Sequence, residues 1–391
     1  MPSRSFVIRL SAFNAFLFLG SGIQLPFLPL WLKSQGLGDA RTSLVVAAMM
    51  AIRILAMPLG TYIADRTGNR RRVIVFSAFA SFACYALLHF AEGFWAILVM
   101  AVLAAALFAP VGPLIEVFAI EGSVHYGIDY GRIRLWASLS FLAGSLISGL
   151  LLELVPVAWV IVLIAAAQGV GALATLVLPP DHGIVKPRTQ GIRVGGVLAS
   201  VIAGSFVIFA AAASIGQASH GLMYAMGSVH FDDLGYSKFT IGKLWAVAVI
   251  CEIVMFAFSN RFYRRFGAVN LIVIGVACGA LRWGVMAIEP PLAILFLAQG
   301  LHAGSFGLTH LGTMHYIRET IPDGMRNTVQ GLYSALSGGI LLSATMWAAG
   351  PLYTAFGGHA YAVMALYSGL ALALALILRR VSPIARGARA T

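Results

Sequence analysis

This sequence has few charged residues and few cysteines. Only 10% of its 391 residues are charged, 14 residues are acidic and 3 are cysteines. So few charges cannot cover the surface of a soluble globular domain of this length, which excludes that class. Cys84, Cys251 and Cys278 fall inside apolar runs, where a thiol acts as a small apolar side chain. We therefore expect no disulfide.

Motifs of enzymes and of ATP-driven pumps are also missing. The sequence contains no Gly-x-Ser-x-Gly and no glycine-rich phosphate loop with a lysine. His302, His310 and His315 are spaced by eight and five residues, whereas the ligands of a zinc-binding helix are four residues apart. We therefore expect no enzyme, no metal site and no cofactor.

What the sequence has in abundance is apolar residues, at 60% of the chain, with a mean hydropathy of +0.90. Runs of about 20 apolar residues, enough to cross a bilayer as a helix, recur along it. They lie at 6–32, 41–64, 72–90, 94–121, 132–154, 156–178, 197–230, 239–259, 267–287, 291–317, 327–355 and 359–379. The pattern predicts an all-α membrane protein with about twelve transmembrane helices. The first run is too long for a signal peptide and should remain attached.

The positions of the basic residues predict the orientation of these helices. The chain has 26 lysines and arginines and a net charge of +12, which in a soluble protein would indicate nucleic acid. Here most of them fall in alternate connections between apolar runs, as in 66–72 and 261–265. Cytoplasmic loops carry such an excess. We expect a multi-pass protein of the cytoplasmic (inner) membrane, with both termini in the cytoplasm and no nucleic-acid partner.

The two halves of the chain repeat each other. Gly36 aligns with Gly235, Arg66 with Arg261, and 135–140 with 332–337, at nearly constant offset. A polar stretch rich in proline separates the halves. The sequence therefore predicts two pseudo-symmetric six-helix bundles, 1–178 and 197–391, joined by a cytoplasmic linker, 179–196. Each match alone could be chance, but internal repeats of this kind are typical of alternating-access carriers.

The first basic turn carries a motif in Gly60, Asp65, Arg66, Gly68 and Arg70. It resembles the loop motif between helices two and three of the major facilitator superfamily. Further stretches resemble the phenylpropionic acid permease group of that superfamily, which is related to lactose permease. These stretches are 25–32, 53–58, 113–116, 129–136, 217–220, 242–245, 282–283 and 301–307.

This resemblance implies the major facilitator fold and a proton-coupled symporter that takes up a small organic acid such as 3-phenylpropionate. The expected partners are the small-molecule substrate, protons and the lipid bilayer, and we expect a monomer. A proton-coupled sugar or nucleoside symporter is the alternative, and a carrier-derived receptor or sensor is a less favoured one. The chain departs from the group at Glu116, Ala137 and Ser305, where Asp, Gly and Thr are expected.

Ionisable residues within spans cost at least ~2.5–3.5 kcal/mol each, so they normally face a cavity or a partner. In the first half these candidates for substrate binding or proton coupling are Arg53, Glu116 and Arg134. Glu116 can pair with Arg53 or with Arg134, and in lactose permease the positions matching Glu116 and Arg134 bind sugar hydroxyls. The alternative is an ion pair that only fixes helix packing. Pro110 and Pro113 are expected to break the helix before Glu116.

In the second half the candidates are His220, Glu252, Arg282, Gln299 and His302. A carboxyl group in a medium of low dielectric constant can hold a proton near neutral pH, so Glu252 is a candidate proton carrier and Arg282 its structural partner. His302 matches the coupling histidine of lactose permease, but Gln299 and Ser305 replace the Lys and Glu near it. Helical spacing places His302, Phe306 and Thr309 on one face. Interhelical packing is the alternative role for the histidines.

Gating is expected from Gly60, Asp65, Arg66 and Arg70. The superfamily uses the acid that matches Asp65 as an inner gate. Here we expect Asp65 to accept hydrogen bonds from the start of the eleventh span, at 326–328, because an acid is stabilised at a helix N-terminus.

Overall fold

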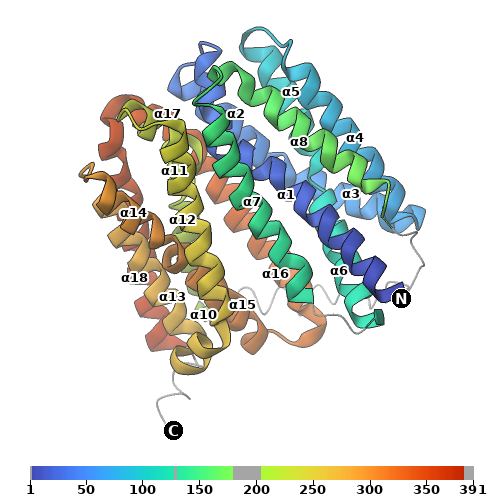
Figure 1. The fold of residues 1–391 in the computed structure, drawn as a ribbon. Coiled ribbons are helices and arrows are strands. Elements are labelled where there is room, and N and C mark those ends of the chain that lie inside the picture. The colour runs from blue at the N-terminus through green and yellow to red at the C-terminus, as the bar shows by residue number, and fades with distance from the viewer. Residues whose placement is uncertain (1, 127–129, 179–203, 383–391) are drawn as a thin grey trace. The chain divides into compact units, whose positions relative to one another are not determined.

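The computed structural model describes residues 2–126, 130–178 and 204–382, and these form helices and no strand (Figure 1). The α-helices are α1 (Pro2–Ser34), α2 (Asp39–Ala51), α3 (Arg53–Thr67), α4 (Arg70–Leu88), α5 (Gly93–Phe108), α6 (Val111–Tyr126), α7 (Tyr130–Leu151), α8 (Val160–Thr175), α10 (Gly204–Ala218), α11 (Gly221–Asp233), α12 (Lys238–Ala257), α13 (Ser259–Met286), α14 (Leu292–Gly300), α15 (Thr309–Thr320), α16 (Arg326–Ser334), α17 (Leu342–Phe356) and α18 (Tyr361–Val381). Short 3-10 or π-helical turns are η1 (Val157–Trp159), η2 (Ala303–Leu308), η3 (Asp323–Met325), η4 (Ala335–Leu341) and η5 (Gly357–Ala360).

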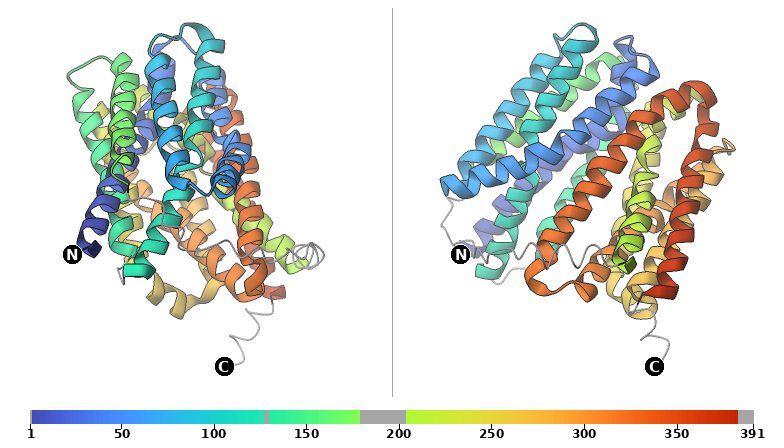
Figure 2. Two further views of the ribbon diagram at one scale, coloured as in Figure 1. Left: turned by 90° about the vertical axis from the view of Figure 1, so that its right-hand side faces the viewer. Right: turned by 180° about the vertical axis from the view of Figure 1, so that it is seen from behind.

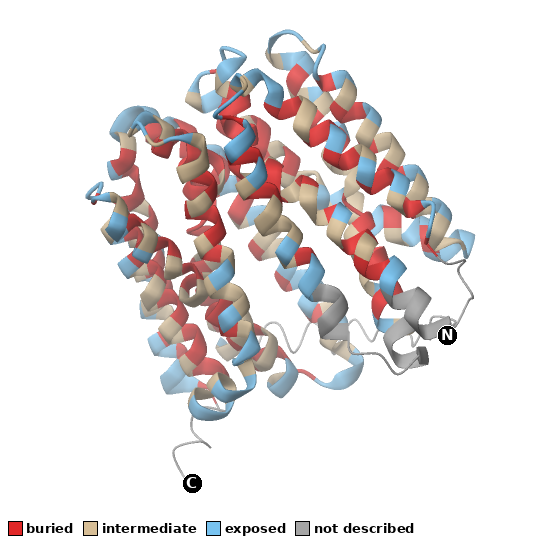
Figure 3. Ribbon diagram, in the orientation of Figure 1, coloured by how far each residue is buried: buried red, intermediate tan, exposed pale blue. Residues whose placement is uncertain are grey.

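The described helices have the length and composition needed to cross a membrane. Ten stretches meet that requirement by length and composition, and a shorter apolar helix covers Leu135–Leu151. One of the ten, Asp323–Val381, is 59 residues long and contains the last two predicted spans. Exposed positions lie along the helices of both units (Figure 3), and many of them carry large apolar side chains, as lipid-facing positions require. The all-α membrane fold with about twelve spans is confirmed.

Several spans are interrupted, and the causes differ. α5 ends at Phe108 and α6 begins at Val111, because Pro110 and Pro113 lack the N–H groups that would continue the helix. This break is the predicted one. The break at Ser219 and His220, between α10 and α11, contains no proline. A Cβ on the adjacent Gly221 would lie 2.8 Å from Thr345 Cβ, so only glycine allows this close approach of α17.

Contacts divide the chain into two compact units. Unit 1 comprises Met1–Lys186 and Tyr224–Ala246, and unit 2 comprises Pro187–Met223 and Val247–Thr391. The boundaries predicted for the six-helix halves stay a prediction, and the predicted linker, 179–196, lies outside the described residues.

In unit 1, α1 packs along α7 and α8, and α4 packs against α5 and α8 (Figures 1 and 2). Glycines permit this packing: a Cβ on Gly22 of α1 would lie 2.3 Å from Phe141 O of α7. The hydrophobic effect does not drive helices together inside a bilayer, so they associate by close packing. Small residues permit this because they let the helix backbones approach each other.

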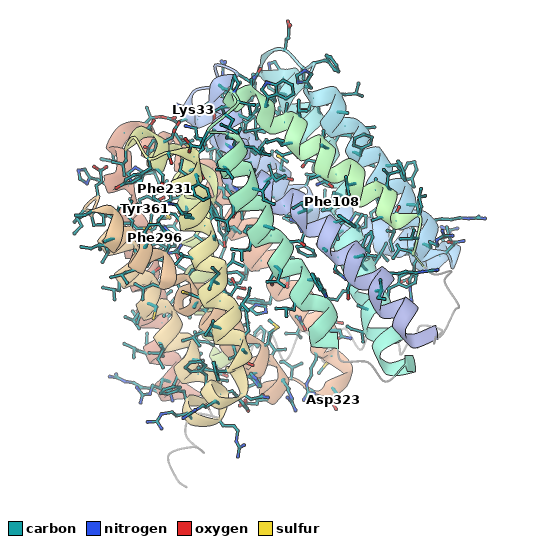
Figure 4. All side chains as sticks on the ribbon, in the orientation of Figure 1. Lys33, Phe108, Phe231, Phe296, Asp323 and Tyr361 are labelled. Atoms are coloured by element: carbon teal, nitrogen blue, oxygen red, sulfur yellow. The ribbon has the colours of Figure 1, made fainter. Side chains whose placement is uncertain are left out.

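In unit 2, α13 packs against α15 and α18, and α10 packs against α18. The core includes Phe209, which stacks on Tyr316 with ring centroids 4.1 Å apart. Tyr361, labelled in Figure 4, is fully buried and stacks on Trp283 at 5.8 Å.

Two turns of unit 1 share one backbone conformation, as the sequence repeat predicts. Gly36 has φ 78° and Gly235 has φ 80°, a left-handed conformation that favours glycine. Lys33, labelled in Figure 4, pairs with Asp39 across the first turn, and Lys238 pairs with Asp232 across the second. The lysine precedes the aspartate in the first pair and follows it in the second, but the two residues are 6 positions apart in both pairs. The repeat is therefore structural as well as sequential.

Candidate functional site

A buried guanidinium lies at the centre of a polar network in unit 2. Arg282 of α13 is 1% exposed. Its Nη2 donates to Gln299 Oε1 at 2.7 Å, and its Nη1 donates to His302 Nδ1 at 3.0 Å and to Ser305 Oγ at 3.3 Å. Its guanidinium carbon lies 4.3 Å from the centroid of a Trp283 ring. A buried charge is stabilised when its donors find acceptors, and these contacts supply two acceptors for Nη1 and one for Nη2.

The contact with Arg282 fixes the tautomer of His302. Arginine has no acceptor, so His302 Nδ1 must accept, and the ring proton of a neutral imidazole lies on Nε2. His302 Nε2 is 3.2 Å from Glu252 Oε2 of α12. A neutral His302 therefore donates to the carboxylate and links the positive Arg282 to the negative Glu252. The role of Arg282 as structural partner of Glu252 stays a prediction, and His302 contacts both side chains.

A second branch of the network runs through Ser305 to His220. Ser305 Oγ accepts from Arg282 and is 3.2 Å from His220 Nε2. His220 Nδ1 is 3.1 Å from Gln217 O, a carbonyl that can only accept, so Nδ1 carries the proton. Ser305 then donates to His220 Nε2. All the hydrogen-bonding directions in this branch are therefore fixed by Arg282 and by a backbone carbonyl.

The irregular segments of two spans place these side chains. His220 lies in the break between α10 and α11, and His302 and Ser305 lie where α14 gives way to the π-helical η2. Gln217 Nε2 donates to Phe306 O at 3.3 Å, and Trp283 Nε1 donates to Ser219 Oγ at 2.9 Å. Irregular backbone at membrane depth is found where it is buried in protein or lines a cavity, and π-helical turns are frequent at functional sites.

The sequence predicts that His302, Phe306 and Thr309 share one face of the tenth span. In the structure His302 and Thr309 both contact α13, at Arg282 and at Gly275. The ring of Phe306 stacks on His302 at 5.1 Å and on His310 at 6.0 Å between centroids. Thr309 is fully buried against Gly275 of α13, where a glycine Cβ would lie 2.2 Å from its Oγ1.

The candidate site residues of the first half of the chain lie in unit 1 and are distant in sequence from the network around Arg282. Arg53 is the first residue of α3, directly after the interruption at Ile52, and is exposed. Glu116 is half-buried in α6. Arg134 lies in α7, but its side chain is outside the described part. The pairing of Glu116 with either arginine stays a prediction.

The predicted gating residues have distinct surroundings. A Cβ on Gly60 of α3 would lie 2.4 Å from Pro110 Cβ, so α3 touches the proline break of the fourth span here. Arg70 Nη1 donates to both carboxylate oxygens of Glu121, at 2.9 and 3.0 Å. Asp65 and Arg66 are exposed in the last turn of α3. The hydrogen bonds expected from the eleventh span to Asp65 stay a prediction.

Sequence reasoning missed a polar contact near Arg53. Tyr85 of α4 is 1% exposed, and its hydroxyl donates to Gln24 Oε1 of α1 at 2.9 Å. Gln24 is a polar residue inside a long apolar run, and this signal was available in the sequence. The partner of Arg70, Glu121, was equally visible as an acid at the C-terminal end of the fourth span. Within the described residues, no cluster of three His, Cys, Asp or Glu is placed to hold a metal ion.

Comparison with known proteins adds evidence of a different kind. The family described as MFS_1 like matches residues 7–364. The chain is 31% identical over 356 residues to the probable 3-phenylpropionic acid transporter of Escherichia coli (strain K12), covering 89% of this chain and 92% of that protein. It is 24% identical to the maltose permease of Geobacillus stearothermophilus, over 84% of this chain and 83% of the permease. Among solved structures, the nucleoside transporter NupG has a TM-score of 0.82 at 16% identity, covering 96% of this chain and 98% of that one, a likeness of fold.

Proposed function

Because the chain belongs to the MFS_1 like family of the major facilitator superfamily, and is thus a multi-pass membrane transporter rather than an enzyme, we propose that it is a proton-coupled symporter. Its proposed substrate is a small organic acid with an aromatic ring, such as 3-phenylpropionate, taken up across the inner membrane. Both termini are proposed to lie in the cytoplasm, since most basic residues then fall on that side.

The observation that carries the proposal is the linkage of Arg282, His302 and Glu252 inside unit 2. The negative charge of Glu252 offsets the positive charge of the buried Arg282, and the neutral His302 connects the two groups by hydrogen bonds. Protonation of Glu252 removes the negative charge that His302 connects to the positive charge of Arg282. An anionic substrate would then restore the balance, so binding of the proton and of the acid would favour each other.

The chemistry of the site also suits an acid with a ring. Phe306 lies within the stack of His302 and His310, and an aromatic substrate can extend such a stack. A carboxylate can accept from a guanidinium, and Arg53 of unit 1 is exposed and therefore open to a ligand. The 31% identity to the probable 3-phenylpropionic acid transporter favours the same class of substrate.

A sugar is the second candidate, supported by the 24% identity to a maltose permease. Sugars also stack on aromatic rings and accept hydrogen bonds from His and Gln. The charge of Arg53 favours the acid over the sugar, because a guanidinium forms stronger, charge-assisted hydrogen bonds with a carboxylate than with a neutral hydroxyl.

Uptake into proteoliposomes with an imposed pH gradient tests the proposal. Labelled 3-phenylpropionate, maltose and uridine are offered separately, with inside-alkaline vesicles and with vesicles at equal pH. We expect accumulation of 3-phenylpropionate above the external concentration only with the gradient. Gradient-driven accumulation of maltose alone would favour the sugar carrier, and binding without accumulation of any solute would favour a receptor.

A further inference from the structure

A cavity of about 610 Å³ lies in unit 1 at the ends of three helices. Arg9 of α1 and Arg71 of α4 line it, together with apolar or small residues of α1 and of the end of α8. None of these lining side chains is acidic. The cavity therefore combines two positive charges with an apolar wall, and neither the polar network of unit 2 nor the predicted gate uses it.

Both arginines lack a counter-charge among the described residues. The ion pairs found there involve neither Arg9 nor Arg71, whereas the adjacent Arg70 pairs with Glu121. Arg71 Nη2 donates to Leu176 O at 2.8 Å and so caps the end of α8. Its Nε is buried and has no hydrogen-bond partner. A buried donor without a partner costs about 1–3 kcal/mol, so an acceptor in the cavity would stabilise this arrangement.

The position of the cavity along the spans indicates the kind of acceptor. It lies where the spans Ile8–Ser34 and Arg70–Leu88 begin and just beyond the end of Val157–Thr175. Its wall includes exposed apolar side chains, with Ile8 at 59% and Leu176 and Val177 at 50% each. Span ends lie at the level of the lipid headgroups, and basic pockets between helices at that level bind anionic headgroups.

We propose that this cavity binds the phosphate group of an anionic membrane phospholipid. Arg9 and Arg71 supply charge-assisted hydrogen bonds to the phosphate oxygens, and the Nε of Arg71 gains its missing acceptor. The exposed Ile8, Leu176 and Val177 lie against the upper part of an acyl chain. Soluble phosphate offers the same oxygens but no apolar part, so it would leave this wall uncovered.

Native mass spectrometry of the detergent-purified full chain measures the binding. The protein is titrated with dioleoylphosphatidylglycerol, with dioleoylphosphatidylcholine and with inorganic phosphate. We expect preferential retention of phosphatidylglycerol. Arg9→Gln should weaken it about fivefold, because one basic group near a membrane surface contributes about that factor to binding of an anionic lipid. Arg9 is exposed, and none of the ion pairs among the described residues involves it, so this variant leaves the cap by Arg71 intact.

Two further variants keep the test specific. Ala12→Phe fills the cavity without changing its charge and should also reduce retention of phosphatidylglycerol. Arg379→Gln with Arg380→Gln removes two exposed charges from the end of α18, outside the cavity, and should leave it unchanged. Equal retention of the two lipids, equal loss in the control variant, or displacement of the lipid by inorganic phosphate at equal concentration would overturn the proposal.

Discussion

Arg282 Nη1 donates to His302 Nδ1 at 3.0 Å, and this one contact determines where the imidazole proton of a neutral His302 lies. The proton on Nε2 points to Glu252 Oε2, 3.2 Å away. A cation on α13 is thereby connected to an anion on α12 through a neutral ring. The proposed coupling between proton and substrate depends on this geometry.

Replacing His302 tests whether transport depends on the hydrogen bonds that this side chain makes or on the imidazole ring itself. In His302→Gln the amide oxygen can accept from Arg282 and the amide nitrogen can donate to Glu252, so exchange of substrate should remain within about tenfold of wild type. His302→Leu removes one hydrogen bond from the buried Arg282 and one from the half-buried Glu252. A hydrogen bond to a charged group is worth about 1.5–3 kcal/mol, so exchange should fall more than tenfold. Counterflow of labelled substrate in proteoliposomes measures both. His89→Leu, at an exposed position of unit 1, is the control.

Gly60→Ala should destabilise the protein. The added Cβ would lie 2.4 Å from Pro110 Cβ, and neither helix can yield without moving its backbone. Overpacking of this kind costs about 1–3 kcal/mol. The midpoint of thermal unfolding in detergent should fall by several degrees, whereas Gly112→Ala, whose Cβ meets nothing within 4 Å, should leave it nearly unchanged. Equal midpoints for the two variants would contradict the close approach of α3 to the proline break.

Arg70 and Glu121 should show coupled effects on stability. Their side chains are 15% and 20% exposed, so solvent screens the pair only in part. Arg70→Gln and Glu121→Gln should each lower the free energy of unfolding, and the double variant should cost less than the sum of the two. We expect a coupling energy of about 1 kcal/mol from the double-mutant cycle. Additive effects would show that the pair contributes nothing.

Asp65→Asn tests the predicted inner gate. The variant should reach the membrane in normal amount but lose net uptake, because an amide is not stabilised by a helix N-terminus as a carboxylate is. Asp65→Glu keeps the charge and should retain part of the uptake. Uptake by cells, normalised to protein in isolated membranes, measures both variants. Normal transport by Asp65→Asn would remove the gate.

The sequence predicted the spans, the proline break and the paired turns because each depends on local chemistry. A long apolar run specifies a membrane helix, Pro110 cannot donate a backbone hydrogen bond, and Gly36 and Gly235 tolerate a left-handed backbone. It also identified the residues of the unit 2 network, since charged and imidazole side chains are rare in apolar runs.

The features that the sequence did not predict depend on tertiary contacts, which no single segment of the chain determines. The break at His220 has no proline, and the tenth span contains the π-helical turn η2. The roles of Gln299 and Ser305 as acceptors for Arg282 became visible only when α13 was placed against the tenth span. Packing of one helix on another decided each of these features.

Proton movement during substrate entry tests the central claim most directly. Proteoliposomes in weakly buffered medium receive 3-phenylpropionate, and the external pH is recorded together with label uptake, for wild type, for Glu252→Gln and for the exposed control Glu289→Gln. We predict that wild type and the control make the medium alkaline as the acid enters, and that Glu252→Gln exchanges substrate without moving protons. Unchanged proton uptake by Glu252→Gln would contradict the account.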